Sequence, residues 1–190
     1  MKSSVADFEL TRPTVWVLAG LLMLMDASGL WAAEEKPSGG SSSQGDCELT
    51  DSKREMLSSI NEARSQARQC GDQRCAAVKP LTWSCTLEAA AEAHSLDMAE
   101  NDYFSHTGPD GVGIQQRVSN RGYLWRAVGE NIAAGQESIV AVVEGWLDSP
   151  GHCSNIMNDA FTEMGMAKAK PDDPGSTYPS YWTQVLGQPR

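Results

Sequence analysis

The sequence predicts an α+β domain, because helical and strand patterns both occur but never alternate in a regular βαβ order. The first half carries apolar residues at helical spacing over about 52–69 and 86–101. The last third instead shows strand patterns, with alternating methionines in 162–168 and aromatic and β-branched residues in 181–186. The sequence contains no internal repeat, so we expect one folded domain.

Local signals mark the expected ends of the helices. Ser52 and Glu55 fit a capping box at the start of the first helix. A short helix is expected over 113–121. A further helix starts at Ser138 and stops at the Pro150-Gly dipeptide, because proline disfavours helical geometry in the residue before it.

The N-terminal region has the pattern of an export signal followed by a tether. Residues 15–25 form an apolar run of the length of a signal-peptide core, and small residues allow cleavage near 29–33. The run is too short to span a bilayer comfortably, although an uncleaved anchor is the alternative. We therefore expect a signal peptide over 1–33, a flexible polar linker over 34–46 and the folded domain over 47–190. The mature protein is expected to be secreted, extracellular or periplasmic, without a stable membrane span.

The net charge of the chain argues against polyanions as its default partners. The formal net charge is −10 at pH 7, from 25 acidic and 15 basic residues. Nucleic acids and anionic membranes are bound by clustered lysines and arginines, and no basic run of that kind occurs. We therefore expect no nucleic-acid partner.

The five cysteines favour disulfides over a zinc site. Structural zinc sites use paired Cys-x-x-Cys steps, and the sequence has none. Export to an oxidising compartment makes disulfides the better interpretation. The odd count leaves at least one thiol over, or one intermolecular bridge.

Candidate functional side chains are few. His106 and His152 lie in segments bounded by glycine and proline, and Glu130 follows Gly in the segment 129–135. Neutral imidazoles can bind a divalent metal that a carboxylate orients or joins, and the same trio suits acid–base chemistry. The alternative is that each side chain only stabilises a local turn. His94 instead falls on an apolar helical stripe, which indicates a hydrogen-bonded core or boundary histidine.

No motif indicates a particular enzyme. The sequence has no G-x-S-x-G nucleophile elbow, no H-E-x-x-H and no phosphate-binding glycine loop. Cys153 adjoins His152, but in an exported protein a disulfide is the better interpretation of this cysteine.

Five motifs nevertheless occur in a distinctive order. They are LTWSCTLEAAAEAHSLDMAENDYFSHTGPDG (81–111), GENIAAG (129–135), VVEGWLDSPGHCSNIM (142–157), FTEMGMA (161–167) and YWTQVLG (181–187). Together they resemble the CAP superfamily, also called the SCP/TAPS or pathogenesis-related-1-like domain, in its short bacterial form. The resemblance implies a three-layer α-β-α sandwich with a central antiparallel sheet, and a large cleft lined by two histidines and two acids.

Carried over to this sequence, the resemblance implies a cleft formed by His106, Glu130 and His152. His106 and His152 are the candidate metal ligands, and a divalent cation such as zinc is the candidate cofactor. The second acid of the family falls on Ser149, which is a departure and weakens the implied metal affinity. Asp148 or Glu144 is the alternative source of a carboxylate, although helical spacing points Asp148 about 100° away from Ser149.

The resemblance also implies a disulfide pairing and a function. It implies a Cys70–Cys153 bridge, with Cys75–Cys85 as the second bridge and Cys47 left free in the tether. It further implies a secreted binding or interaction module for a divalent cation, a lipid, another small ligand or an extracellular partner, rather than an enzyme. The alternatives are a metal-assisted hydrolase or protease and a structural cell-envelope protein with a vestigial cleft.

Overall fold

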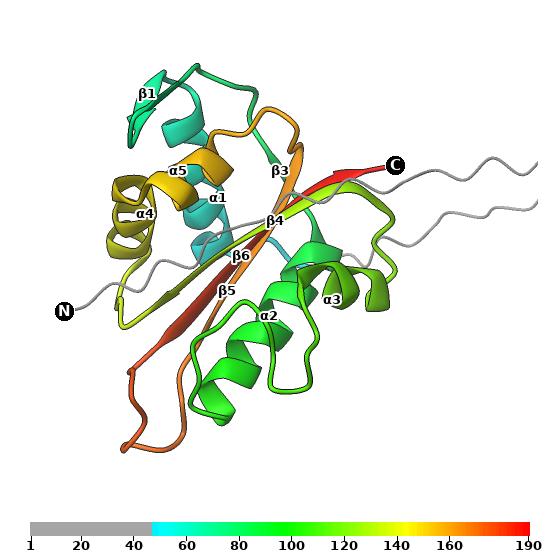
Figure 1. Ribbon diagram of the computed structural model, residues 1–190, viewed down its shortest axis with the longest axis vertical. Helices are drawn as coiled ribbons and strands as arrows, with labels where there is room; N and C mark the ends of the chain where they lie inside the picture. Colours follow the sequence, from blue (N-terminus) through cyan, green and yellow to red (C-terminus); the bar gives the residue numbers. More distant parts are fainter. Residues whose placement is uncertain (1–46) are drawn as a thin grey trace, which may run out of the picture. The chain divides into compact units, whose positions relative to one another are not determined.

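The computed structural model describes residues 47–190, which form a sheet between two layers of helices (Figure 1). The predicted signal peptide and linker lie outside the described residues. The helices are α1 (Asp51–Arg64), α2 (Cys85–Glu100), α3 (Ile114–Asn120), α4 (Ile139–Asp148) and α5 (Pro150–Ile156), and the strands are β1 (Arg68–Cys70), β2 (Gln73–Cys75), β3 (Thr82–Trp83), β4 (Trp125–Ala134), β5 (Glu163–Ala169) and β6 (Tyr181–Pro189). The predicted α+β sandwich is confirmed. No helix within 47–190 combines the length and apolar character needed to cross a bilayer.

The main sheet has the strand order β3-β5-β6-β4, so β4 lies at one edge. The three long strands pair antiparallel, as expected, and the short β3 adds parallel to β5. Helices α1, α4 and α5 cover one face, and α2 and α3 cover the other (Figure 1). Side chains alternate between these faces along each strand, so neighbouring residues of β4 serve different layers.

Strand β4 was not expected from the sequence, where 129–135 looked like a glycine-bounded segment. Gly129 in fact lies within the strand, because a Cβ there would come within 2.7 Å of the Phe161 ring. Only Gly135, with φ +95°, adopts a conformation that ends the strand. Gly129 therefore permits close packing and does not break the strand.

The first helix starts one residue earlier than predicted and ends five residues earlier. Thr50, and not Ser52, is the N-cap, since its side chain accepts a hydrogen bond from the Lys53 amide. The helix ends at Arg64, and the chain then forms the β1–β2 hairpin where helix had been expected to continue to 69.

The fully buried Arg64 explains how this helix end is held. Its guanidinium donates to the carbonyls of Lys79, Ile156, Asn158 and Phe161 at 2.6–3.2 Å. Four backbone acceptors from distant segments thus satisfy one buried cation. Burial lowers the pKa of Arg64 to about 10, and the Asp159 charge opposes this shift. The arginine therefore remains a cation at neutral pH.

Pro150 starts a helix, whereas the sequence suggested that it ends one. Helix α4 ends at Asp148, Ser149 links the two helices, and Pro150 occupies the first turn of α5. Proline is favoured in a first turn, because its missing amide proton has no helical partner there. His152 therefore lies on a helix and not in a loop.

Two disulfides join distant segments, and one predicted pair is wrong. Cys70 bonds Cys153, as expected, but Cys85 bonds Cys47, and Cys75 is a buried free thiol. The Cys75–Cys85 prediction fails because Cys75 points into the core from the hairpin, whereas Cys85 opens α2 beside the start of the described chain. Cys47 is therefore part of the folded domain.

Substitutions at two glycines test the packing of the sheet against α2. A Cβ at Gly165 of β5 would collide with the backbone of Leu87 and Glu88, whereas Gly145 of α4 has open space around it. We expect Gly165→Ala to destabilise the fold by about 3 kcal/mol or more, because helix backbone cannot move aside like a side chain. Gly145→Ala should instead stabilise it by about 1 kcal/mol. Urea unfolding midpoints of the two oxidised variants measure this, and similar midpoints would contradict the close approach.

Candidate functional site

The site is built around Glu130, a buried carboxylate in the edge strand β4. Its side chain is 1% exposed and faces the α2–α3 layer. His106 Nδ1 donates to Oε1 at 2.9 Å, and Arg117 Nη2 donates to Oε2 at 2.7 Å. Both carboxylate oxygens therefore have charged or polar partners, as a buried carboxylate requires.

Arg117, on α3, extends this contact to the loop that carries His106. One of its nitrogens also donates to the His106 carbonyl at 3.0 Å, and another donates to the Val112 carbonyl at 2.8 Å. The 104–113 loop is thus fastened to the sheet through one guanidinium. No sequence pattern pointed to Arg117, which looks like an ordinary surface residue of a short helix.

The charge state of Glu130 follows from these partners. Burial alone would raise the pKa of the carboxyl. The hydrogen bond from His106 and the positive charges of Arg117, His94 and His106 together outweigh burial and hold the pKa below its usual value. Glu130 is therefore ionised at neutral pH, and the His106 proton must reside on Nδ1 in order to be donated.

His94 lies beneath this cluster and is hydrogen-bonded in the core, as predicted. Its ring is 1% exposed, its Nε2 bonds the Ser105 carbonyl at 2.9 Å, and it lies 3.9 Å from Glu130 Oε1. Burial lowers the pKa of His94, with Glu130 opposing this shift. Its proximity to Glu130 was not foreseen, because spacing along one helix says nothing about the opposite strand.

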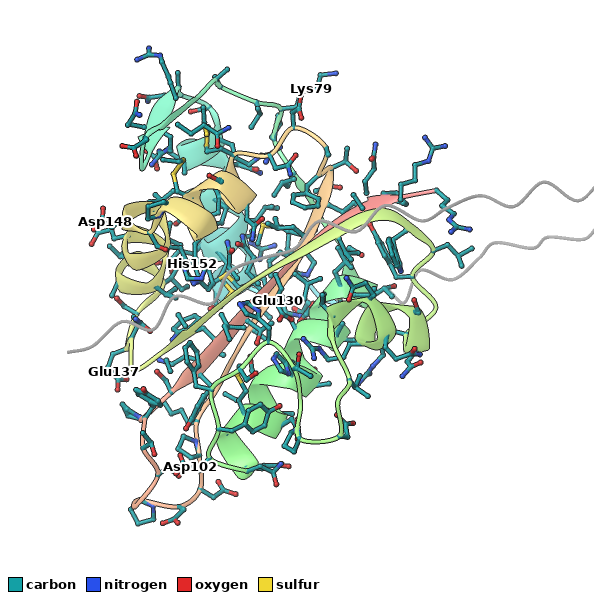
Figure 2. The ribbon with its side chains drawn as sticks, in the orientation of Figure 1. Lys79, Asp102, Glu130, Glu137, Asp148 and His152 are labelled. Atoms are coloured by element: carbon teal, nitrogen blue, oxygen red, sulfur yellow. A yellow bond between two sulfur atoms is a disulfide. The ribbon has the colours of Figure 1, made fainter. Side chains whose placement is uncertain are left out.

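His152 lies on the first turn of α5 and is half-buried; Figure 2 labels it together with Glu130. Burial and, to a lesser extent, the charge of His106 lower the pKa of His152 to about 4. His152 is accordingly neutral at pH 7, with a lone pair available for a cation.

A buried amide network fixes α5 against β4. Asn131 Nδ2 donates to Gln184 Oε1 at 2.9 Å and to the His152 carbonyl at 3.3 Å. Asn155 Nδ2 donates to Asn131 Oδ1 at 3.0 Å and to the Glu130 carbonyl at 3.2 Å. Trp146 of α4 similarly donates to the Ile132 carbonyl at 3.2 Å. The helix that carries His152 is therefore positioned by the same strand that carries Glu130.

Ser149, where a second acid was expected from the resemblance, has a buried hydroxyl without a hydrogen-bond partner among the described residues. It links α4 to α5 and is followed by the turn that carries His152. The Asp148 side chain is exposed, so it does not take the place of the missing acid. The region thus offers a hydroxyl and two imidazoles.

The fit to a divalent cation is partial. Among residues 47–190, the group of three close ligand atoms is Cys47, Cys85 and Glu88, and its sulfurs already form a disulfide. Both oxygens of Glu130 are already engaged by His106 and Arg117, so this carboxylate has no free oxygen for a cation. Among the described residues, neither the Nε2 atom of His106 nor the ring of His152 has a hydrogen-bond partner, so both remain open to a ligand from outside the chain.

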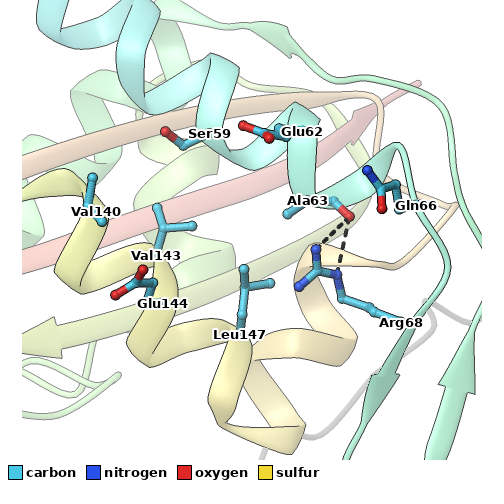
Figure 3. A pocket seen from close by; sticks show the side chains of 9 residues that line it. All are labelled: Ser59, Glu62, Ala63, Gln66, Arg68, Val140, Val143, Glu144 and Leu147. Atoms are coloured by element: carbon cyan, nitrogen blue, oxygen red, sulfur yellow. Dashed lines mark hydrogen bonds between the residues drawn. The ribbon is translucent and has the colours of Figure 1, made fainter.

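A separate groove lies between α1 and α4, and it is lined by Glu144 but not by His106, Glu130, Ser149 or His152. Its volume is about 380 Å³. Figure 3 shows apolar side chains on the walls, carboxylates at the rim, and Arg68 held at one end by the Ala63 carbonyl. The apolar lining is Ala63, Val140, Val143 and Leu147, and the carboxylates are Glu62 and Glu144.

Comparison with known proteins agrees with this architecture. The model of the cysteine-rich secretory protein family, CAP, matches residues 57–186. The chain belongs to this family.

Similar proteins come from several bacteria. "Uncharacterized protein YkwD" of Bacillus subtilis is 36% identical over 107 residues, which is 56% of this chain and 39% of that protein. An extracellular SCP-domain protein of Bacillus anthracis has 32% identity and a TM-score of 0.51, covering 58% of this chain and 34% of that one. An outer surface protein of Borrelia burgdorferi shares the fold, with a TM-score of 0.61 at 22% identity over 76% of this chain and 97% of that one. The chain thus spans well under half the length of the two Bacillus relatives.

The buried imidazoles predict a pH dependence of stability. The folded pKa of His152 is about 4, against about 6.5 in the unfolded chain. Between these values the unfolded state binds a proton that the folded state does not, so stability falls as the pH is lowered from 6.5 toward 4. His94 shifts in the same direction, whereas Glu130 loses its contribution only below its unfolded value of 4.5.

We therefore expect the free energy of unfolding of His152→Gln to fall less steeply than that of the wild type as the pH is lowered through this window. Urea unfolding from pH 7.5 to 5 measures it, with Asp148→Asn as the exposed control. An unchanged slope in His152→Gln would argue against a neutral buried ring.

Proposed function

We propose that this chain is an exported binding module whose cleft holds a divalent cation together with a small ligand. The proposed cleft would lie between the His106 loop and α5. The observation that carries the proposal is the pairing of His106 Nδ1 with the ionised Glu130. Because that nitrogen donates its proton to the carboxylate, the lone pair of Nε2 is left on the other side of the ring for a cation.

His152 supplies the second nitrogen, which its low pKa keeps unprotonated at neutral pH. Two imidazoles leave at least two positions of a tetrahedral ion for water or a ligand. Zinc bound there would act as a Lewis acid toward that ligand. With Ser149 in place of a second acid, the cleft keeps only the Glu130 charge, which Arg117 balances. A cation would therefore be held less tightly, and an anionic ligand would meet less repulsion.

Two features support export. The expected leader over 1–33 has the composition of a signal peptide. The two disulfides require an oxidising compartment, since cytosolic thiols are kept reduced. We accordingly propose a secreted, extracellular or periplasmic location.

A hydrolase is the weaker alternative. Among the described residues, no hydroxyl or thiol is hydrogen-bonded to the ring of His106 or His152, and the Ser149 hydroxyl is unpartnered. A nucleophile needs an adjacent base for activation, so the geometry offers no activated serine or cysteine. A structural envelope protein with a vestigial cleft would bind neither a cation nor a ligand.

Zinc titration tests the proposed cleft. We expect His106→Ala and His152→Ala each to weaken zinc binding at least about tenfold, and Glu130→Gln to weaken it about tenfold by removing the partner that orients His106. Competition with a chromogenic chelator measures the affinity, and near-UV circular dichroism checks the fold.

Asp148→Ala is the matched control, because this exposed carboxylate is the immediate neighbour of Ser149 and should leave zinc affinity unchanged. If zinc affinity persists in the variant that carries both His106→Ala and His152→Ala, the proposed zinc site in the cleft is disproved. Absence of any binding by the wild-type protein would favour the structural alternative.

The groove between α1 and α4 supports a second candidate, the binding of a lipid acyl chain. Its volume lies within the range of small-molecule sites, and its walls are aliphatic. The groove does not share residues with the cleft, so the two activities can be tested apart.

We expect Val140→Asp to weaken binding of a fluorescent fatty acid severalfold. Val140 is 54% exposed at the rim, so a carboxylate is tolerated by the fold but repels an acyl chain. Leu96→Asp, at a comparably exposed leucine of α2, should leave binding unchanged, as should His152→Ala. An equal loss of fatty-acid binding in all three variants would exclude the groove as the binding site.

A further inference from the structure

The turn between α3 and β4 meets the end of β6, and five residues there form a surface that we call the arginine–leucine tip. It consists of Arg121, Leu124, Trp125, Arg126 and Arg190. Leu124 is 72% exposed, more than any other large hydrophobic side chain among residues 47–190. An apolar side chain in this position is held in water at a cost, unless a partner covers it.

The backbone of the turn is rigid, so the exposure of Leu124 is built into the fold. Gly122, with φ +80°, makes the turn, and Tyr123 is buried directly afterwards with its hydroxyl donating to Glu163 at 2.8 Å. The Arg190 amide donates to the Leu124 carbonyl at 2.9 Å. Leu124 therefore projects from a turn that is fixed on both sides.

Trp125 is held in place at the same tip. Its indole nitrogen donates to Ser119 at 3.1 Å, and its carbonyl accepts from Arg190 Nε at 3.1 Å. Its ring remains partly exposed. An indole with one polar contact and one open apolar surface is typical of the boundary between water and lipid.

The charge of the tip is opposite to that of the molecule. Arg121, Arg126 and Arg190 are exposed, and none of them forms an ion pair among the described residues, although the chain carries a net charge of −10. The half-buried Glu163 carboxylate reaches this turn, where it accepts the hydrogen bond from the Tyr123 hydroxyl. Three guanidinium groups outnumber this one carboxylate.

Three of the acidic residues lie at the far end of the sheet. Asp172 and Asp173 precede β6, and Asp102 is tied to the same loop by a hydrogen bond from the Thr177 amide at 2.8 Å. Figure 1 shows that loop at the opposite end of the strands from the C-terminus. The nine residues of β6 span about 27–30 Å, over three times the Debye length of about 8 Å at physiological salt. The acidic loop therefore does not cancel the local field at the tip.

We propose that the arginine–leucine tip docks onto the surface of an anionic lipid bilayer. The guanidinium groups meet the headgroups, while Leu124 and Trp125 enter the headgroup–acyl boundary. A soluble polyanion would use the arginines but would leave Leu124 in water, so the exposed leucine favours a bilayer. The contact is interfacial, and it is independent of the cleft and of the groove.

Vesicle co-sedimentation tests this contact in the chain from Glu34 onward. Both disulfides and the hydrophobic clusters lie within 47–190, so this truncation leaves them intact and removes the apolar run at 15–25. We expect salt-sensitive binding to vesicles of phosphatidylcholine with 30% phosphatidylglycerol, as the probe chosen here, and much weaker binding to pure phosphatidylcholine. Arg121→Glu and Arg126→Glu should each weaken binding about fivefold or more, the effect of one charge near an anionic surface.

Leu124→Ser should weaken binding severalfold at unchanged charge. The matched controls are Leu96→Ser, at an exposed leucine of α2, and Arg54→Glu, at an exposed arginine of α1; both should bind like the wild type. The proposal is overturned by absence of binding to the anionic vesicles, by tip variants that bind as well as the controls, or by binding to soluble polyphosphate that Leu124→Ser leaves unaffected while vesicles are not bound.

Discussion

The ion pair between Glu130 and Arg117, completed by His106, is the interaction on which the rest of the site depends. A carboxylate buried in a sheet is tolerated only when its charge is compensated, and here the compensation comes from two other segments of the chain. The loop after α2 and the helix α3 are therefore held where the charge requires them. Removing one partner would leave a buried charge unpaired, so the position of His106 and the integrity of this face are coupled.

The alternation of side chains along β4 extends this organisation to the other layer. Glu130 points to α2 and α3, while its neighbour Asn131 points to α5 and contacts the His152 carbonyl. Two consecutive residues of one strand thus position both histidines. A shift of register by one residue would move the side chains of each face of β4 to the opposite face. The contacts on both faces of the strand therefore fix its register.

The sequence predicted the fold class, four of the helices and the two C-terminal strands, because each depends on local periodicity. Resemblance pointed to His106 and Glu130, which the structure brings into hydrogen-bond contact. Local patterns could not reveal β4, since Gly129 resembles a strand breaker until the Phe161 ring is placed against it. They also could not reveal the role of Arg117, because its partners lie on another strand and in a loop. The Cys47–Cys85 bond was missed because Cys47 directly follows the linker-like residues 34–46.

The side-chain contacts along β4 have one more consequence, which concerns association between molecules. An edge strand exposes carbonyls that a strand from another chain could use to extend the sheet. Here the carbonyls of Glu130 and Ile132 already accept hydrogen bonds from the side chains of Asn155 and Trp146. The helices that position His152 thus also obstruct this edge, and the same two side chains protect the protein against edge-to-edge aggregation.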